Sequence, residues 1–340
     1  MRLPTEEFSQ LRDRFVGRRV CVTGGTGFIG GHLIDALLSL GAIITVIDDL
    51  SNSALDHLSE LIDMEPERVR FVHGSILEPA ALADAIEPGR CEYVFHLAAI
   101  GSVPRSIAEP TRTWDVNATG TLRVLRSAQQ AGVRRVHLAS SSSVYGDQRT
   151  LPMPESAPAR PLSPYAMSKL TGEQLCAVWS RCYGLSTVCT RYFNIFGPRQ
   201  SPNSQYAAVV AAFCDRLMKG LPPIIFGDGK QSRDFTFVDN AVLATLLAAS
   251  SPRAFTGECF NVGCGKQTSV LELAHMIAVA TGNASIDPVF ERARSGEVPH
   301  SLADISAARE LLNYEVLHTV EAGLTETLRW HKQHQDTPSK

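Results

Sequence analysis

The chain has 340 residues, of which 44% are hydrophobic and 20% charged, and its formal net charge is -3. This size is sufficient for one large domain or two interlocked ones, while the balanced charge argues against a nucleic-acid-binding surface and no apolar run reaches the roughly 18 residues of a membrane span. The eight cysteines contain no Cys-x-x-Cys pair and the ten histidines show no ligand spacing, so we expect reduced thiols, a cytoplasmic location and no metal site.

The predicted elements begin with a short amphipathic helix that carries Phe8, Leu11 and Phe15 on one face, in place of a signal peptide. From residue 19 onward, short β-branched runs alternate with helical patterns. We expect strands at 19–23, 43–47, 69–73, 93–97, 136–139 and 187–192, and helices at 30–40, 79–86, 113–131 and 164–183. This alternation is typical of a parallel sheet with helices on both faces.

The pattern changes after about residue 195, where Gly, Pro, Ser and Asn cluster between 197 and 203. Apolar segments return at 241–249, 259–262 and 270–281. The fold class predicted is therefore α/β, a Rossmann-type doubly wound parallel sheet with a smaller mixed α/β C-terminal domain. We expect residues 1–193 to form the first domain, with a returning segment near 235–262, and residues 194–234 and 263–335 to form the second, with the active site between them.

A glycine pattern directly follows the first predicted strand and opens the first helix of the sheet. Gly24, Gly27 and Gly30 form Gly-x-x-Gly-x-x-Gly. Glycines at this place allow a tight turn and a close approach of the backbone to a pyrophosphate, which the free N–H groups of the helix N-terminus then bind. The context predicts a dinucleotide site.

The second predicted strand ends in an acidic pair. A carboxylate there accepts hydrogen bonds from the adenosine ribose and repels a 2′-phosphate, so Asp48 favours NAD over NADP. The neighbouring residues Asp49, Ser51 and Asn52 are expected to close over the adenosine.

Tyr165 and Lys169 are four residues apart at the start of a predicted helix, so they share one helix face. A cation beside a phenol favours the phenolate, and we therefore expect Lys169 to lower the pKa of Tyr165. A tyrosine tuned in this way can act as a general acid or base towards a hydroxyl group.

Seven motifs together resemble the extended short-chain dehydrogenase/reductase family. They are Thr-Gly-Gly-Thr-Gly-Phe-Ile-Gly (23–30), Asp-Asp-Leu-Ser-Asn (48–52), His-Leu-Ala-Ala (96–99), Ser-Ser-Ser-Val-Tyr-Gly (141–146), Ser-Pro-Tyr-Ala-Met-Ser-Lys (163–169), Arg-Tyr-Phe-Asn (191–194) and Arg-Asp-Phe-Thr-Phe-Val-Asp (233–239). Within that family the chain is similar to nucleotide-sugar 4-epimerases, above all to the branch acting on UDP-N-acetylglucosamine and its uronic acid.

The resemblance implies a retained NAD and a UDP-sugar whose C4 is oxidised and then reduced on its other face. It implies that Tyr165 takes the C4 hydroxyl proton, that Lys169 holds the nicotinamide ribose, and that Ser141 donates to the C4 oxygen. Further cofactor contacts implied are Phe28, Ile29, Ser75, Ile76, Leu97, Ala98, Ala99, Asn117 and Tyr192. The implied substrate contacts are Ser102, Ser142, Ser143, Asn194, Arg199, Ala208, Val209, Phe226, Arg233, Arg294, Glu297 and Ser301.

The same comparison leaves several alternatives open. Family dehydratases carry Thr-Asp-Glu where this chain has three serines at 141–143, and this difference argues against dehydration. Two alternatives to an epimerase remain: a UDP-glucuronate decarboxylase or other NAD-dependent nucleotide-sugar-modifying enzyme, and a catalytically silent NAD-binding regulator. A small residue at Ser301 leaves room for an N-acetyl group. UDP-glucuronate epimerases carry Arg where this chain has Ser201, with Arg199 two residues away. The resemblance also implies a homodimer formed through a bundle of the helices at 113–131 and 164–183.

Overall fold

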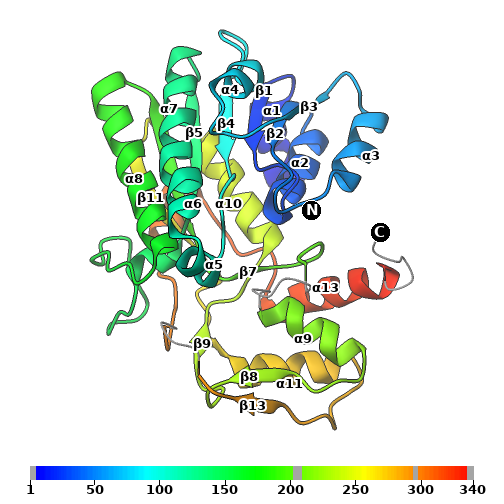
Figure 1. The fold of residues 1–340 in the computed structure, drawn as a ribbon. Coiled ribbons are helices and arrows are strands. Elements are labelled where there is room, and N and C mark those ends of the chain that lie inside the picture. Colours follow the sequence, from blue (N-terminus) through cyan, green and yellow to red (C-terminus); the bar gives the residue numbers. More distant parts are fainter. Residues whose placement is uncertain (1–4, 202–208, 294–297, 335–340) are drawn as a thin grey trace.

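The computed structural model describes residues 5–201, 209–293 and 298–334 (Figure 1). Its centre is a seven-stranded sheet with the order β11-β6-β5-β4-β1-β2-β3, and each pair of neighbours is parallel. The strands are β1 (Arg19–Thr23), β2 (Ile43–Asp48), β3 (Val69–His73), β4 (Tyr93–His96), β5 (Arg135–Ser141), β6 (Ser186–Tyr192) and β11 (Thr256–Val262). The strand order reverses between β1 and β4, which is where doubly wound sheets bind their ligands.

Both faces of this sheet are buried under helices, as the alternating sequence pattern predicts. The helices α2 (Phe28–Ser39) and α10 (Val238–Ser250) cover one face, and α4 (Pro79–Ala85), α7 (Gly120–Gln130) and α8 (Pro164–Tyr183) cover the other. Successive strand residues alternate between two apolar clusters: Val20 and Val22 pack in one, and Cys21 packs in the other. This two-sided burial explains why the strands are apolar almost throughout, and the predicted fold class is confirmed.

The predicted helix at 113–131 is interrupted in the structure. It begins earlier, as α6 (Pro110–Trp114), passes through a π-helical turn (Asp115–Thr119) and continues as α7. A π turn shifts the backbone hydrogen bonds to a five-residue spacing, and such turns are frequent at functional sites. Hydrophobic periodicity does not reveal this shift, because the apolar face continues on either side of the turn.

The rest of the chain forms a smaller part below the sheet in Figure 1. It contains the short strand pairs β7 (Ile195–Phe196) with β10 (Thr236–Phe237), β8 (Ile224–Phe226) with β13 (Val289–Glu291), and β9 (Ser232–Arg233) with β12 (Thr268–Ser269). Its helices are α9 (Val209–Met218), α11 (Val270–Ala280) and α13 (Val320–His334), while α12 (Ser306–Leu312) packs against α10 and β11. Between these segments the chain returns to the large sheet through α10 and β11. The exact domain boundaries stay a prediction.

The N-terminal helix α1 (Thr5–Phe15) packs beside α10. Leu11 and Phe15 are buried, and the Phe15 ring lies 5.6 Å from Tyr93 and 6.1 Å from Phe95, measured between ring centroids. The predicted amphipathic helix is therefore an integral part of the core. In the described ranges, no helix has the length and apolar character needed to cross a bilayer.

Helices also lie in the connections between the strands of the large sheet. The segment after β3 is followed by α4, and the segment after β4 leads into α5 (Val103–Ala108) and then α6. On the opposite side, α3 (Asp56–Met64) lies beside β3. The connections at the carboxyl ends of the strands thus surround one space, which is the site described next.

Candidate active site

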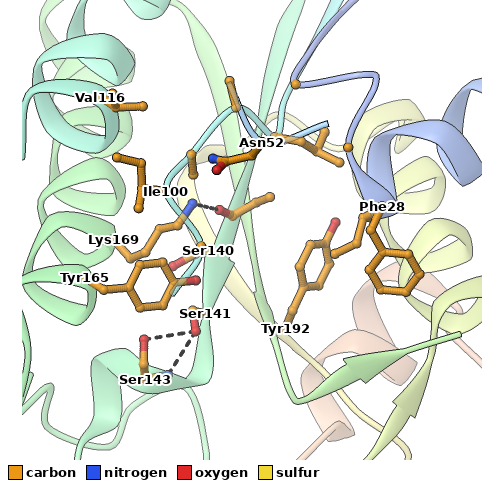
Figure 2. A pocket seen from close by; sticks show the side chains of 18 of the residues that line it. Phe28, Asn52, Ile100, Val116, Ser140, Ser141, Ser143, Tyr165, Lys169 and Tyr192 are labelled. Atoms are coloured by element: carbon orange, nitrogen blue, oxygen red, sulfur yellow. Dashed lines mark hydrogen bonds between the residues drawn. The ribbon is translucent and has the colours of Figure 1, made fainter. Parts of the chain in front are cut away.

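A cavity of about 1140 Å³ lies at the carboxyl ends of the central strands (Figure 2). Its walls come from the segments that follow β1 to β6 and from the smaller part of the chain, as Gly24, Asp48, Ser141 and Arg233 illustrate. Residues far apart in the sequence meet here because parallel strands end at one edge of the sheet. A cavity of this size is large enough for a dinucleotide and a second ligand.

The glycine loop after β1 has the shape that a pyrophosphate requires. Gly24 has φ +72°, and a Cβ there would lie 2.6 Å from the backbone nitrogen of Ala98. A Cβ on Gly27 would approach only the carbonyl oxygen of Gly24, at 3.3 Å, so the loop backbone stays open to a ligand at this point. Helix α2 begins directly afterwards with no side chain capping its N-terminus. Its first N–H groups are therefore available to an anion.

Asp48 lies at the end of β2 and its carboxylate is fixed by the backbone around it. One carboxylate oxygen accepts from the Thr26 nitrogen at 3.2 Å and the other from the Leu50 nitrogen at 3.0 Å. These bonds leave further lone pairs on both oxygens. The cavity wall continues through three neighbouring predicted positions, Asp49, Ser51 and Asn52.

The other predicted cofactor positions line the same cavity, with one exception. Lining residues are Gly24, Gly27, Phe28, Ile29, Gly30, Ser75, Ile76, Leu97, Ala98, Ala99 and Tyr192. The exception is Asn117, which lies buried in the π-helical turn. Its side chain accepts from the Ile100 nitrogen at 2.8 Å and donates to Ser168 Oγ at 3.0 Å. Asn117 therefore contacts the cavity through Ile100, which lines it.

Tyr165 and Lys169 point from α8 into the cavity (Figure 2). The helix begins where Ser163 Oγ accepts from the Ala166 nitrogen at 3.1 Å and Pro164 takes the first helical position. The Lys169 ammonium donates to the carbonyl oxygen of Ala139 at 2.8 Å and lies 5.9 Å from the centroid of the Tyr165 ring. The predicted one-face arrangement is present in the structure.

The predicted effect of Lys169 on Tyr165 is wrong for this structure. Burial raises the pKa of Tyr165 above its ordinary value, and an interaction with the Ser141 hydroxyl offsets this only in part. Burial also lowers the pKa of Lys169 to about 8. Both shifts have one physical cause, because a dry environment disfavours the charged form of either group. Residue spacing carries no information on this burial.

Three successive serines form the floor of the cavity beside Tyr165. Ser141 ends β5, and its hydroxyl oxygen accepts from the Ser143 nitrogen at 3.2 Å and from the Ser143 hydroxyl at 3.0 Å (Figure 2). Ser142 lines the same space. The Ser141 hydroxyl still has its own proton to donate, so it can serve an oxygen placed near Tyr165.

The predicted substrate positions other than the three serines divide into three groups. Asn194, Arg233 and Ser301 line the cavity, and Asn194 Nδ2 donates to Ser301 Oγ at 3.3 Å. Ser102, Arg199, Val209 and Phe226 are not part of the lining. Ala208, Arg294 and Glu297 lie outside the described residues.

Two members of the second group have other partners. Ser102 caps α5, where its hydroxyl oxygen accepts from the Arg105 nitrogen at 3.3 Å. The Arg199 guanidinium forms an ion pair with Asp35 on α2 at 2.7 Å and contacts His57 on α3. The backbone of Arg199 has φ +67°. The structure thus pairs this arginine with α2 and α3, and Arg199 does not line the cavity.

Sequence reasoning missed several lining residues. Gln200 lines the cavity, and its Nε2 donates to the carbonyl oxygen of Ile195 at 3.1 Å, while its Oε1 is buried without a hydrogen-bond partner among the residues that the structure describes. Ser140, Met153 and Arg112 also contribute to the wall. Gln200 lies within the Gly- and Pro-rich segment 197–203, and this unusual composition is the feature of the sequence that could have indicated a lining residue there.

The fold and this site define a dinucleotide-binding enzyme of the short-chain dehydrogenase type. Residues 20–263 match the model of the NAD dependent epimerase/dehydratase family, and the chain belongs to that family. This match confirms the predicted resemblance to the family. It also confirms the prediction of an NAD-dependent enzyme. The glycine loop and the end of β2 are the residues that would hold NAD.

Known relatives cover almost the whole chain. A UDP-glucose 4-epimerase of Mycolicibacterium smegmatis is 38% identical over 92% of this chain and 98% of its own. A UDP-N-acetyl-alpha-D-glucosaminuronate decarboxylase of Bacillus cytotoxicus is 31% identical over 93% and 98%. Among solved structures, a UDP-N-acetylglucosamine 4-epimerase of Methanobrevibacter ruminantium M1, in complex with UDP-N-acetylmuramic acid, is 36% identical, covers 94% of this chain and 100% of its own, and has a TM-score of 0.87.

Proposed function

We propose that the protein is a UDP-hexose 4-epimerase that inverts C4 of a UDP-sugar with a retained NAD. The observation that carries this proposal is the meeting of Tyr165, Lys169 and Ser141 in the cavity that the glycine loop also lines. Bound NAD supplies the acceptor and donor of a hydride and brings a positive charge into the cavity. The names of the relatives support a UDP-sugar as the substrate.

Each of the three side chains has a role that its surroundings support. Tyr165 removes the proton of the C4 hydroxyl and returns it, acting as general base and then as general acid. Burial raises the pKa of Tyr165, and a positive charge brought in by the bound cofactor would act in the opposite direction. Lys169 stays charged near neutral pH and orients the nicotinamide ribose. Ser141 donates its proton to the C4 oxygen.

The nucleotide must be held firmly if the sugar is to turn over within the site. Asn194, Arg233 and Ser301 lie on the side of the cavity formed by the smaller part of the chain. A guanidinium matches the oxygens of a diphosphate, so Arg233 is the proposed diphosphate contact. The proposed roles of Ala208, Arg294 and Glu297 in binding UDP stay predictions, as do those of Ser102, Val209 and Phe226.

The structure favours a neutral sugar over a uronic acid. Arg199, the arginine that the sequence offers as a partner for a carboxylate, is paired with Asp35. The sugar side of the described lining is instead rich in neutral hydroxyl and amide groups, namely Ser141, Ser142, Ser143, Asn194, Gln200 and Ser301. The small side chain of Ser301 leaves space for an acetamido group. We therefore place UDP-N-acetylhexosamines and UDP-hexoses ahead of UDP-uronic acids.

A second candidate function is decarboxylation of a UDP-uronic acid, because a relative of 31% identity carries the name of such an enzyme. Its substrate has a carboxylate, for which the same lining offers hydroxyl groups. The remote alternative, a silent NAD-binding regulator, is disfavoured because Ser141, Tyr165 and Lys169 are all present at the cavity.

We also propose a homodimer and a cytoplasmic location. Apolar side chains are exposed on the outer helices: Trp114 is 43% exposed, Met167 45% and Val178 46%. Such a surface on α6 and α8 suits a second copy of the same helices. All eight cysteines are free thiols, in keeping with a reducing compartment.

One experiment separates the candidate functions. The purified protein is incubated, with no added NAD, with UDP-glucose, UDP-N-acetylglucosamine or UDP-glucuronate, and the products are identified by proton NMR. Inversion at C4 of a neutral sugar is the expected result. A pentose product from UDP-glucuronate would show that the protein is a decarboxylase. Unchanged sugars in every sample would favour the NAD-binding regulator. The Tyr165→Phe variant serves as the matched control.

A further inference from the structure

Helix α8 carries a third polar side chain in line with the two that enter the cavity. Tyr165, Lys169 and Glu173 are spaced by four residues and so lie on one helix face. Glu173 is one turn further along than Lys169, is only 2% exposed and does not line the cavity. A carboxylate buried this deeply needs partners, because removing a charge from water is costly.

Glu173 has a complete set of partners. The Arg191 guanidinium on β6 donates to it through two nitrogens, Nε to Oε1 at 2.9 Å and Nη2 to Oε2 at 2.8 Å. The Ser140 hydroxyl donates to Oε1 at 2.5 Å. The fork geometry of arginine suits a carboxylate in this way. The pair is therefore a rigid buried unit.

This unit holds the end of β5 next to α8. The Lys169 ammonium donates to the carbonyl oxygen of Ala139, and the hydroxyl of the next residue, Ser140, donates to Glu173. The residue after that is Ser141, whose hydroxyl faces Tyr165 in the cavity. Consecutive residues of β5 are thus bonded to consecutive turns of α8. Strand register places Arg191 directly beside Ser140.

The far side of Arg191 connects the same unit to β11 and to the segment that follows β5. Its Nη1 donates to the Tyr145 hydroxyl oxygen at 2.8 Å, and the Tyr145 hydroxyl donates to Asn261 Oδ1 at 2.6 Å. Asn261 Nδ2 donates to the carbonyl oxygen of Met153, which lines the cavity. The network therefore reaches the cavity wall at Ser140 and Met153, while Glu173, Arg191 and Asn261 lie behind the lining.

We propose that Glu173 is a positioning residue for the catalytic groups: braced by Arg191, its carboxylate fixes Ser140, and so the adjoining Ser141 hydroxyl, against α8, and it places a negative charge one turn from the Lys169 ammonium. This inference rests on the proposed function for the roles of Ser141, Tyr165 and Lys169. Glu173 acts through these residues and does not touch the substrate.

The charges around Lys169 support the electrostatic half of this assignment. Burial lowers the pKa of Lys169, and the Glu173 charge acts in the opposite direction. Burial lowers the pKa of His96 on β4 to about 3, so that ring is neutral. A hydrogen bond with Cys176 and burial raise the pKa of the Cys189 thiol on β6, so it is neutral as well. With Tyr165 also protonated, Glu173 is the negative charge among these neighbours that favours the ammonium at neutral pH.

A direct test measures the titration of Lys169 itself. The full-length protein is labelled with [ε-¹³C]lysine, and the Lys169 signal is identified as the one lost in Lys169→Met. We expect the titration midpoint of Lys169 to fall by about one pH unit or more in Glu173→Gln, since an opposite charge has been removed. NAD content is measured in every sample, so that only proteins with the same fraction of bound NAD are compared.

Two further variants keep the test decisive. Glu173→Gln leaves Arg191 buried without its partner, so Glu173→Gln/Arg191→Met removes both charges, and the midpoint should fall there too. Glu321→Gln, which breaks the exposed ion pair with Lys266, is the control and should leave the midpoint unchanged. An unchanged Lys169 midpoint in the folded double variant would overturn the electrostatic role.

The geometric half is tested by Ser140→Ala, which removes one hydroxyl and leaves both charges in place. We expect a fall of about tenfold in kcat with little change in KM, because displaced catalytic groups slow the chemical step. An unchanged kcat in this variant would overturn the positioning role. The lysine titration needs no substrate, so its outcome is separate from any failure to find the epimerase reaction.

Discussion

The Lys169 ammonium donates a hydrogen bond of 2.8 Å to the carbonyl oxygen of Ala139, two residues before Ser141. The bond joins the helix that carries Tyr165 to the strand that carries Ser141, so the three polar groups of the site have one shared support. It also leaves the ammonium two further protons to donate. The nicotinamide ribose is the partner that we propose for them.

Activity should therefore decline at alkaline pH. Burial lowers the pKa of Lys169 to about 8, so the ammonium is mostly charged at pH 7 and loses its proton as the pH rises through about 8. We expect kcat to fall over that interval and to recover when the pH is lowered again. Stopped assays between pH 6.5 and 9.5, with unfolding monitored by circular dichroism, measure this. A flat profile across pH 8 in folded protein would contradict the prediction.

Replacing Tyr165 with Phe should reduce kcat by about 10²–10⁴-fold, the range typical for loss of a general acid or base. The ring remains, so α8 and its packing are preserved and the melting temperature should change little. Turnover of the best UDP-sugar gives the measurement, and the NAD content of the purified variant is its control. Near-normal turnover would remove Tyr165 from the proposed mechanism.

Ser301→Tyr should reduce turnover of N-acetylated sugars more than that of plain hexoses. Ser301 lines the cavity beside Asn194, and a large ring there would occupy the space for an acetamido group. The comparison is the ratio of kcat/KM for UDP-N-acetylglucosamine to that for UDP-glucose. Ser301→Ala keeps the site small and should leave the ratio unchanged, whereas equal losses on both sugars in the tyrosine variant would refute the steric argument.

Introducing charge on the exposed face of α8 should dissociate the proposed dimer. Met167 and Val178 are each nearly half exposed, and Met167→Glu/Val178→Glu would place two carboxylates in an apolar contact. We expect half the wild-type mass by light scattering at micromolar concentration. Val279→Glu, at an apolar position on α11 that is more exposed still, is the control. A wild-type protein that is already monomeric would rule out this interface.

The substitution Phe15→Ala should destabilise the whole fold. The ring is fully buried against Tyr93 and Phe95, and removing a buried phenylalanine costs about 3–5 kcal/mol. Denaturant unfolding measures the loss, and Phe8→Ala, on the partly exposed side of α1, should cost clearly less. Equal losses would mean that α1 contributes no specific packing.

Local and periodic features of the sequence were sufficient for most of the fold. Six strands of the large sheet follow from β-branched runs, and α8 follows from Ser163, Pro164 and Gly184 at its ends. These signals survive in a single sequence because each depends on neighbours within a few residues. The π-helical turn before α7 was missed, since a change of one residue in hydrogen-bond spacing leaves the apolar pattern almost unaltered.

The site shows the same division. The glycine loop, the acidic end of β2 and the Tyr165/Lys169 spacing can be recognised from sequence alone, because each depends on residues close together in the chain. Three other features emerge only in the folded chain. Arg199 pairs with Asp35, Glu173 is paired with Arg191, and burial raises the pKa of Tyr165. These features depend on which distant segments of the chain come into contact and on how much water the contact excludes. The spacing of residues along the chain predicts neither.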